Sequence, residues 1–203
     1  MEEILDFLKF IYPKLSEECL DFLRTVVKMQ VLKRKEIILR PGDVCRKLYF
    51  IKKGLLRCFY LVDDKELTDW VFSENDTVVS VRSFYDQVPS TDFIQALEPS
   101  ELYYISFEHL DYAYRHYLEF NFVGRVLTVK YLRVWHELAR NIRLLDATER
   151  FELLMEQQPG LLLRVPQHVL ATWLDMHPVT LSRLRSEYKK KLASANRGRQ
   201  KPS

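Results

Sequence analysis

The residues whose types and spacing are best suited to recognition chemistry lie in the stretch HPVTLSRLR, residues 177–185. Leu181 and Leu184 are spaced to share the buried face of a helix, and Pro178 is acceptable in its first turn. The polar residues between and beside the two leucines are Thr180, Ser182, Arg183 and Arg185. Because one guanidinium can bind O6 and N7 of guanine together, such an outer face is suited to reading DNA.

Residues 167–186 have the spacing of a helix-turn-helix, whose second helix lies in the DNA major groove. Ala171 is small where the helices would cross, and Asp175 lies in the turn, where a left-handed backbone is usual. The apolar positions that would hold the helices together are Leu170, Leu174, Met176, Leu181 and Leu184. We expect DNA contacts from Gln167, His168, His177, Val179, Thr180, Ser182, Arg183, Lys189 and Lys190. The alternative is an ordinary helical hairpin with a solvated outer face.

The C-terminal end carries an uneven share of the charge, although the whole chain has a net charge of only +3. From residue 183 onward there is one acid, Glu187, against eight basic residues: Arg183, Arg185, Lys189, Lys190, Lys191, Arg197, Arg199 and Lys201. A basic end on a nearly neutral body indicates a polyanionic partner, although a solvated tail would have the same composition.

Composition restricts the class of protein. The chain is 47% hydrophobic and 29% charged, which is typical of a packed core. No stretch approaches the ~20 apolar residues of a membrane-spanning helix, and the acidic start MEEILDFLKF is unlike a signal peptide. Cys19, Cys45 and Cys58 are odd in number and widely spaced, so we expect reduced, packed cysteines and no metal site. These features favour a cytoplasmic protein with no membrane partner.

The sequence pattern changes twice along the chain. Residues 1–30 read as helical, with Ser16 a plausible N-cap. From about residue 30 to residue 107, short β-prone runs alternate with turn signals, as in a sandwich or barrel. From residue 107 the pattern is helical again.

One long helix has an apolar seam with steps of three and four residues, as in a coiled coil. Its members are Phe120, Leu127, Tyr131, Val134, Leu138, Asn141 and Leu145, with Gly124 in the remaining slot. We predict a homodimer with contacts from Leu127, Tyr131, Val134, Leu138, Asn141 and Leu145. The alternative is a long helix packed on its own barrel.

The order of barrel, long helix and helix-turn-helix resembles the CRP/FNR family of bacterial transcription regulators over nearly the whole chain. The segment ILRPGDVCRKLYFIKKGLLRCFY is similar to the first strands of the cyclic-nucleotide-binding fold, with Gly42 and Gly54 where that fold turns. LLDATERF, residues 144–151, resembles the family's hinge, and TLSRLR resembles its recognition helix. The resemblance implies an α+β fold with three parts: a β jelly-roll sensor domain with N-terminal helices (1–118), a dimerisation helix (119–145) and a winged-helix-like helix-turn-helix domain with a basic tail (146–203).

The chain departs from the family where cyclic nucleotides bind. Nucleotide-binding members carry a Gly-Glu pair for the ribose and a later Arg-Ser or Arg-Thr pair for the phosphate. The match places Val79-Ser80 and Ser90-Thr91 there, so both the glutamate and the arginine are missing and a buried phosphate would lack a partner. Arg82 is near enough to substitute. The positions that contact adenine fall on Trp135 and His136. The expected effector pocket comprises Val79, Ser80, Arg82, Ser90, Thr91, Trp135 and His136, with cyclic AMP disfavoured and the small-molecule effector unknown.

Other sensor and enzyme chemistries fit the sequence poorly. Three scattered cysteines cannot supply the four ligands of an iron–sulfur cluster. All histidines follow the β-prone region, so neither a haem ligand nor a cupin metal site is expected on the barrel, and we expect no cofactor. Pro178 and Val179 replace two base-reading side chains of the family, so the target DNA should differ, and Val179 can pack on a thymine methyl. After Tyr188 the chain is basic rather than β-prone, which argues against the family's wing hairpin.

Two functions remain after these exclusions, and neither is enzymatic. The first is a transcription regulator that binds a palindromic operator as a homodimer and does not respond to cyclic AMP. The second is an effector-independent DNA-binding scaffold whose barrel only dimerises or contacts RNA polymerase.

Overall fold

The computed structural model describes the backbone of residues 1–199 and the side chains of residues 1–190. The chain divides into two compact units at Leu138–Ala139, inside the long helix α5 (Phe120–Leu144). Part of the predicted basic tail therefore has side chains outside the described residues, namely those of Lys191, Arg197, Arg199 and Lys201.

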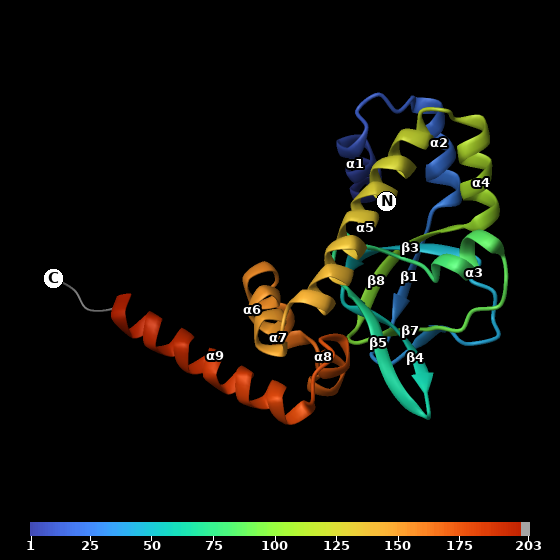
Figure 1. Cartoon of the computed structure of the whole chain (residues 1–203). Helices are drawn as coiled ribbons and strands as arrows, with labels where there is room; N and C mark the ends of the chain where they lie inside the picture. Colours follow the sequence, from blue (N-terminus) through green and yellow to red (C-terminus); the bar gives the residue numbers. More distant parts are fainter. Residues whose placement is uncertain (200–203) are drawn as a thin grey trace. The chain divides into compact units, whose positions relative to one another are not determined.

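The first unit is built on two four-stranded antiparallel sheets (Figure 1). Its strands are β1 (Lys28–Leu32), β2 (Ile37–Leu39), β3 (Lys47–Lys53), β4 (Leu56–Val62), β5 (Lys65–Phe72), β6 (Thr77–Val78), β7 (Phe93–Ala96) and β8 (Ser100–Ser106). One sheet has the order β1-β8-β3-β6, and the other has the order β2-β7-β4-β5. The sandwich predicted between residues 30 and 107 is confirmed.

Two predicted turn glycines have backbones that other residues rarely adopt. Gly42 has a φ of 90° and Gly54 a φ of 116°. A Cβ on Gly54 would also lie 2.7 Å from the Cα of Ser100, so the strands β3 and β4 can turn there only with glycine.

The remaining elements of the first unit are helices on the edges and one side of the sandwich. They are α1 (Glu2–Ile11), α2 (Glu17–Val26), α3 (Val81–Asp86), α4 (Phe107–His116) and the first part of α5. Ser16 caps α2 as predicted, because its side chain accepts a hydrogen bond of 3.2 Å from Cys19 N. The ring of Tyr12, at the end of α1, stacks on Phe122 of α5 at 4.9 Å, which joins the two helices.

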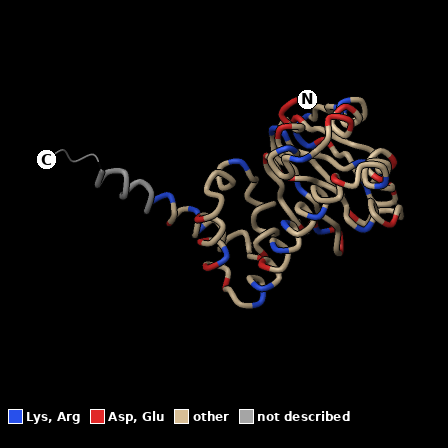
Figure 2. Tube along the Cα trace, turned by 90° about the horizontal axis from the view of Figure 1, so that it is seen from above, with Lys and Arg blue, Asp and Glu red and all other residues tan. Residues whose placement is uncertain are grey.

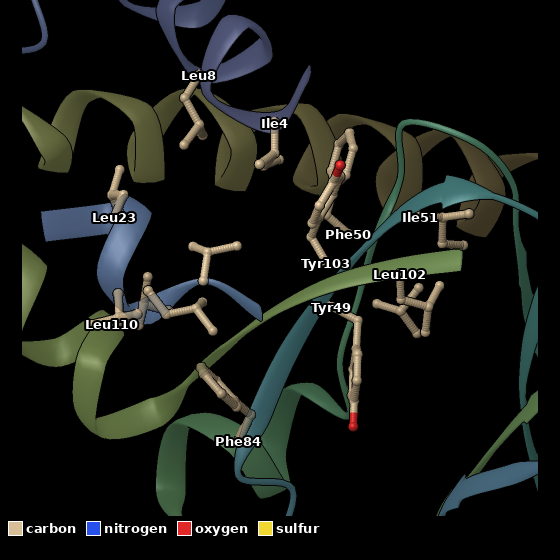
Figure 3. Close-up of a cluster of buried hydrophobic side chains, with 14 of the residues drawn as sticks. Ile4, Leu8, Leu23, Tyr49, Phe50, Ile51, Phe84, Leu102, Tyr103 and Leu110 are labelled. Atoms are coloured by element: carbon tan, nitrogen blue, oxygen red, sulfur yellow. The ribbon is translucent and has the colours of Figure 1, made fainter. Parts of the chain in front are cut away.

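One part of the core lies between these helices and the β1-β8-β3-β6 sheet, and the same cluster continues to the second sheet through Leu56 and Ile94. In Figure 3, Ile4 and Leu8 of α1 and Leu23 of α2 project towards the side of the sheet from which Phe50 and Tyr103 rise. The three cysteines are buried and free, and burial raises the pKa of Cys19 to about 11. They are packing residues, as the sequence predicts.

The first half of α5 packs closely on this unit. Phe120 and Val123 are 5% and 1% exposed. A Cβ on Gly124 would lie 2.6 Å from the hydroxyl oxygen of Tyr114 on α4, so glycine allows the two helices to approach. This half of the helix is therefore part of the barrel unit.

The second unit is helical throughout its described backbone, residues 139–199. After the end of α5 come α6 (Ala147–Gln157), α7 (Leu161–Arg164), α8 (Gln167–Trp173) and α9 (Pro178–Arg199). A capping box of Asp146 and Glu149 starts α6. Residues 139–199 contain no strand, and the chain after Tyr188, where the sequence made a wing hairpin doubtful, continues α9. Among the described residues, no helix is long and apolar enough to cross a membrane.

Candidate functional site

The first unit contains a cavity of about 550 Å³ between the sandwich and α5. This volume lies in the range of about 300–1,000 Å³ that small-molecule sites occupy. Its lining combines apolar and aromatic side chains with a few polar ones: Leu48, Cys58, Asp69, Phe72, Thr77, Val79, Ser80, Val81, Arg82, Tyr85, Asp92, Tyr114, Gly124, Leu127, Thr128, Tyr131, Leu132 and Trp135. The cavity is therefore shaped and lined like a binding site.

Two serines at the cavity form a network with a carboxylate. Ser80 Oγ donates a hydrogen bond of 2.6 Å to Asp92 Oδ2, and Ser90 Oγ lies 3.1 Å from Ser80 Oγ. The hydroxyl of Thr91 donates to the other oxygen of Asp92 at 3.2 Å, and the Asp92 backbone N–H donates to Ser90 Oγ at 2.9 Å. The hydroxyls of Ser80 and Thr91 therefore hold the side chain of Asp92 against the cavity, and Ser90 supports Ser80 from behind.

A second carboxylate reaches the cavity because strand β5 is irregular. The antiparallel register of β4 and β5 runs from Cys58↔Trp70 to Phe59↔Thr68, so Asp69 is an extra residue in a β-bulge. A bulge re-aims side chains that strict alternation would place on the other face of the sheet. Burial raises the pKa of Asp69, and the nearby charge of Asp92 raises it further. Among the described side chains, no hydrogen bond or ion pair to the Asp69 carboxylate is formed.

Aromatic rings form much of the remaining wall. The rings of Trp135 on α5 and Trp70 on β5 lie 5.5 Å apart. Tyr131 accepts a hydrogen bond of 2.5 Å from Thr77 N, and burial raises its pKa to about 12, so its hydroxyl is neutral at physiological pH. Trp135 is 39% exposed, so this wall is open to solvent in part.

The structure brings together some of the predicted pocket residues and not others. Val79, Ser80, Arg82 and Trp135 line the cavity. Ser90 is buried behind Ser80, while Thr91 and His136 are exposed and outside the lining.

The predicted set also missed the two carboxylates. Asp92 directly follows the Ser90-Thr91 pair, so its position could have been noticed. Asp69 stands in the apolar run LTDWVF, where a lone acid is a visible signal.

The predicted dimer residues fall into two groups, those that pack on the barrel and those that stay partly exposed. Leu127 packs against the core of its own barrel, and Tyr131 bonds to Thr77, which is the arrangement the sequence left open as an alternative. Val134, Leu138, Asn141 and Leu145 are partly exposed and remain predictions as dimer contacts. Two apolar side chains on the opposite face of α5, Val126 and Val129, are exposed.

In the second unit, α8, a short turn and α9 occupy the segment that the sequence predicts as a helix-turn-helix. The predicted apolar positions Leu170, Leu174, Leu181 and Leu184 are buried, as is Ala171, and Met176 is partly buried. The turn is closed by Met176 N, which donates to the carbonyl of Ala171 at 3.0 Å. Asp175 has a φ of 49°, so its left-handed conformation in the turn is confirmed.

The first turns of α9 expose several side chains on their outer face. Val179 is 70% exposed, and Ser182 and Arg183 are exposed, while Thr180 is half-buried. Among the described residues, the guanidinium of Arg183 has no hydrogen-bond or ion-pair partner. Arg185 differs, because its Nη2 donates to the carbonyl of Leu162 at 2.6 Å, so its side chain is bonded to α7. The expectation that both arginines form the outer face is wrong for Arg185.

The other predicted DNA contacts lie near the ends of α8 and α9. Gln167 donates to the carbonyl of Pro178 at 3.3 Å, and His177 Nδ1 accepts from Val179 N at 3.3 Å. His168, Lys189 and Lys190 are exposed. Figure 2 shows basic and acidic positions mixed along the trace of the first unit. A nucleic-acid interface in the second unit would therefore depend on these local groups rather than on the net charge of the chain.

One arginine holds the turn of this motif in place. Arg150 on α6 donates to three backbone carbonyls, those of Leu145 at 2.7 Å, Leu174 at 2.9 Å and Asp175 at 3.0 Å. It lies in the predicted hinge LLDATERF and ties the start of α6 to the turn before α9. Sequence reasoning missed this role, since its partners are carbonyls up to 25 residues away.

The comparison with protein families agrees with the β fold of the first unit. Residues 29–117 match the family model of the cyclic nucleotide-binding domain. Among curated proteins, none matches the sequence significantly.

Solved structures match nearly the whole chain. The c-di-GMP-responsive global regulator CLP of Xanthomonas campestris is 18% identical, with a TM-score of 0.65 over 87% of this chain and 93% of that chain. FixK2 of Bradyrhizobium japonicum is 16% identical, with a TM-score of 0.68 over 82% and 86%. A protein placed in the CRP/FNR family, from Eubacterium rectale, is 17% identical, with a TM-score of 0.69 over 89% and 87%. The predicted fold class is confirmed: an N-terminal cyclic-nucleotide-binding β fold, a long helix and C-terminal helices.

Proposed function

We propose that this chain is a sequence-specific DNA-binding transcription regulator of the CRP/FNR type, which binds a palindromic operator as a homodimer in the cytoplasm. The observation that carries the proposal is the division of α9 into two faces. Leu181 and Leu184 are buried, while Val179, Ser182 and Arg183 are exposed and free to meet base edges. The proposal includes no catalytic step.

The similar structures support this role. CLP links cell–cell signalling to virulence gene expression in its own organism, and its fold extends over both units of this chain. For this chain we infer three parts: a sensor domain in residues 1–118, a dimerisation helix in residues 119–145 and a DNA-binding domain in residues 146–203.

The homodimer would use the face of α5 that points away from the barrel. Val126 and Val129 are 45% and 39% exposed on this face, and exposed apolar side chains that lie together often mark a protein–protein contact. The later seam residues Val134 and Leu138 would extend the contact. A palindromic operator fits a protein whose two copies are related by a two-fold axis.

The effector would occupy the cavity between the sandwich and α5, and cyclic AMP is a poor candidate for it. A bound cyclic phosphate needs a cation, whereas here Ser80 donates to the carboxylate of Asp92 and Ser90 bonds to Ser80. Titration calorimetry should show no binding of cyclic AMP at micromolar concentration. Micromolar affinity that is lost in Arg82→Gln would contradict this and would make Arg82 the phosphate partner.

The second candidate function is a DNA-binding scaffold whose barrel senses nothing and only dimerises or contacts RNA polymerase. The cavity of about 550 Å³ favours a sensor, because a barrel with a purely structural role has no use for an unpaired carboxylate inside it. A thermal-shift screen against metabolites separates the two functions, since a scaffold would respond to none.

The experiment that tests DNA recognition starts by selecting bound sequences from a random duplex pool with the full chain. Binding isotherms on the selected operator and on a scrambled duplex then compare Arg183→Ala with Lys190→Ala at several salt concentrations. Arg183→Ala should weaken operator binding by ~1–3 kcal/mol and change scrambled binding little. Lys190→Ala should weaken both duplexes alike and reduce the salt slope by about one unit.

Arg185→Ala is the matched control on the same helix, because Arg185 is bonded to the carbonyl of Leu162. It should lower the stability of the second unit without relaxing sequence preference. If no sequence is enriched, or if Arg183→Ala weakens both duplexes equally, α9 does not read bases as proposed.

A further inference from the structure

The cavity of the first unit has an electrostatic character opposite to that of a phosphate site. Its charged lining consists of two carboxylates, Asp69 and Asp92, and one guanidinium, Arg82. Among the described residues, Arg82 forms no ion pair with either aspartate, and its side chain is exposed. The inner part of the cavity therefore carries a negative charge without a cation to balance it.

Asp69 is the group that folding leaves unused. Asp92 already accepts hydrogen bonds from Ser80 and Thr91, but no described side chain bonds to the Asp69 carboxylate. The bulge in β5 turns this carboxylate into the cavity beside Cys58, where burial and the charge of Asp92 both oppose its ionisation. A carboxylate kept in such a place lacks the positively charged partner that would offset its cost.

The rest of the wall is suited to an apolar body. Phe72, Tyr85, Tyr131 and Trp135 line the same cavity, and the Trp135 ring is backed by Trp70 at a distance of 5.5 Å. Aromatic faces attract cations as well as apolar rings. Carboxylates and aromatic rings therefore favour the same class of ligand.

We propose that the cavity binds a small organic amine, with an apolar, preferably aromatic, body against the aromatic wall and a protonated nitrogen bonded to Asp69. This rests on the proposed function only in naming the ligand as the effector, since the binding itself needs no DNA. The ligand's ammonium group would donate to Asp69 and lie near Asp92. An anionic ligand would instead meet two carboxylates at close range.

The test uses the full chain and two matched sets of probes that share one ring and differ only in charge. The first set is phenethylamine, phenethyl alcohol and 3-phenylpropionate, and the second is tryptamine, tryptophol and indole-3-acetate. Thermal shift and titration calorimetry, both without DNA, measure binding. We expect each amine to bind more tightly than its alcohol, and each carboxylate to bind more weakly than both.

Variants assign the effect to the charge of Asp69. Asp69→Asn should weaken amine binding roughly tenfold or more, the loss expected for a hydrogen bond to a charged group, and leave alcohol binding within about twofold. Asp64→Asn is the matched control, because Asp64 is exposed in the β4–β5 turn with a φ of 61°, which asparagine tolerates. It should bind all probes like the parent chain.

Three results would overturn the proposal: amines that bind no better than their alcohols, carboxylates that bind best and are weakened by Arg82→Gln, or amine binding that Asp69→Asn leaves unchanged. Failure of the DNA proposal would show in the operator isotherms alone and would leave these measurements as they are. Failure of the amine proposal would likewise leave the isotherms of Arg183→Ala unaffected.

Discussion

The two units of this chain both carry charged side chains that their own folding does not use, but they carry them in opposite ways. In the first unit the unused group is Asp69, a carboxylate turned inward into a cavity. In the second it is Arg183, a guanidinium turned outward from α9. A carboxylate inside a cavity lined by aromatic rings is suited to a small molecule that the cavity can enclose. A guanidinium exposed on a helix surface is suited to a macromolecular partner.

The comparison also shows how to separate functional charges from structural ones. Arg150 and Arg185 are as basic as Arg183, but each donates to backbone carbonyls within its own unit. Asp92 is as acidic as Asp69, but hydroxyls of Ser80 and Thr91 satisfy it. Charge alone does not identify a site, and the absence of a partner within the described structure is the better sign.

The largest expected effect comes from substitutions on α5, which packs one face on the barrel and exposes the other. Leu127→Glu would place a charge against the core of the first unit, at a cost of about 3–5 kcal/mol in the free energy of unfolding. Val129→Glu, on the outward face, should leave that free energy within about 0.5 kcal/mol for the monomer. Denaturant unfolding of both variants measures the difference.

Sedimentation then tests what the outward face does. Val129→Glu should convert a dimer into a folded monomer, and its Tm should no longer depend on protein concentration. If Val129→Glu remains dimeric while Leu127→Glu becomes a folded monomer, the seam predicted from Leu127 and Tyr131 is the true interface and the assignment of faces is wrong.

The next effect concerns the arginine that the second unit does use. Arg150→Met keeps the aliphatic stem but removes charge-assisted bonds to the carbonyls of Leu145, Leu174 and Asp175. We expect the second unit to lose about 2–3 kcal/mol of stability. Hydrogen exchange, followed unit by unit, should show faster exchange in α8 and α9 and unchanged exchange in the sandwich.

Arg140→Met is the control for this change, since Arg140 is exposed and has no partner among the described side chains. Its exchange pattern should match that of the parent chain. Equal loss of protection in the two variants would mean that the turn before α9 does not depend on Arg150.

The sequence allowed much of the fold to be predicted because local signals carry it. Ser16 before an amphipathic run specifies a helix start, and Asp175 in a turn specifies a left-handed residue. Alternating β-prone runs and turns specified the sandwich between residues 28 and 106. Each of these features depends on neighbours within a few positions.

The parts that could not be predicted depend on tertiary geometry. Strand alternation has a period of two, so a single bulge changes which face Asp69 occupies, and nothing in LTDWVF marks the bulge. Arg183 and Arg185 are equivalent in the string SRLR, and only the carbonyl of Leu162, 23 residues earlier, distinguishes them. Leu127 follows the coiled-coil spacing, but the same spacing serves packing on the barrel.

The smallest expected effect is the contribution of Asp69 to the stability of the unliganded chain and its dependence on pH. The pKa of Asp69 is raised, first by burial and then by Asp92, above its ordinary value of 3.8. The folded chain therefore binds this proton more tightly than the unfolded chain does. Stability is lost as the pH rises from 3.8 through the raised pKa, and it is not regained at higher pH.

Asp69→Asn removes that cost, so at neutral pH the unliganded variant should be more stable than the parent chain, with a Tm higher by about 2–4 °C for ~1 kcal/mol. The gain should disappear at a pH below 3.8, where the parent carboxyl is protonated in both states. Asp64→Asn should show no such pH-dependent gain. A carboxylate that served only the fold would give the opposite sign, because its removal would destabilise the chain. If Asp69→Asn lowers the Tm at neutral pH, Asp69 has a structural partner and the contrast with Arg183 fails. If it raises the Tm while weakening amine binding, the chain retains an unfavourable charge that only a ligand makes useful.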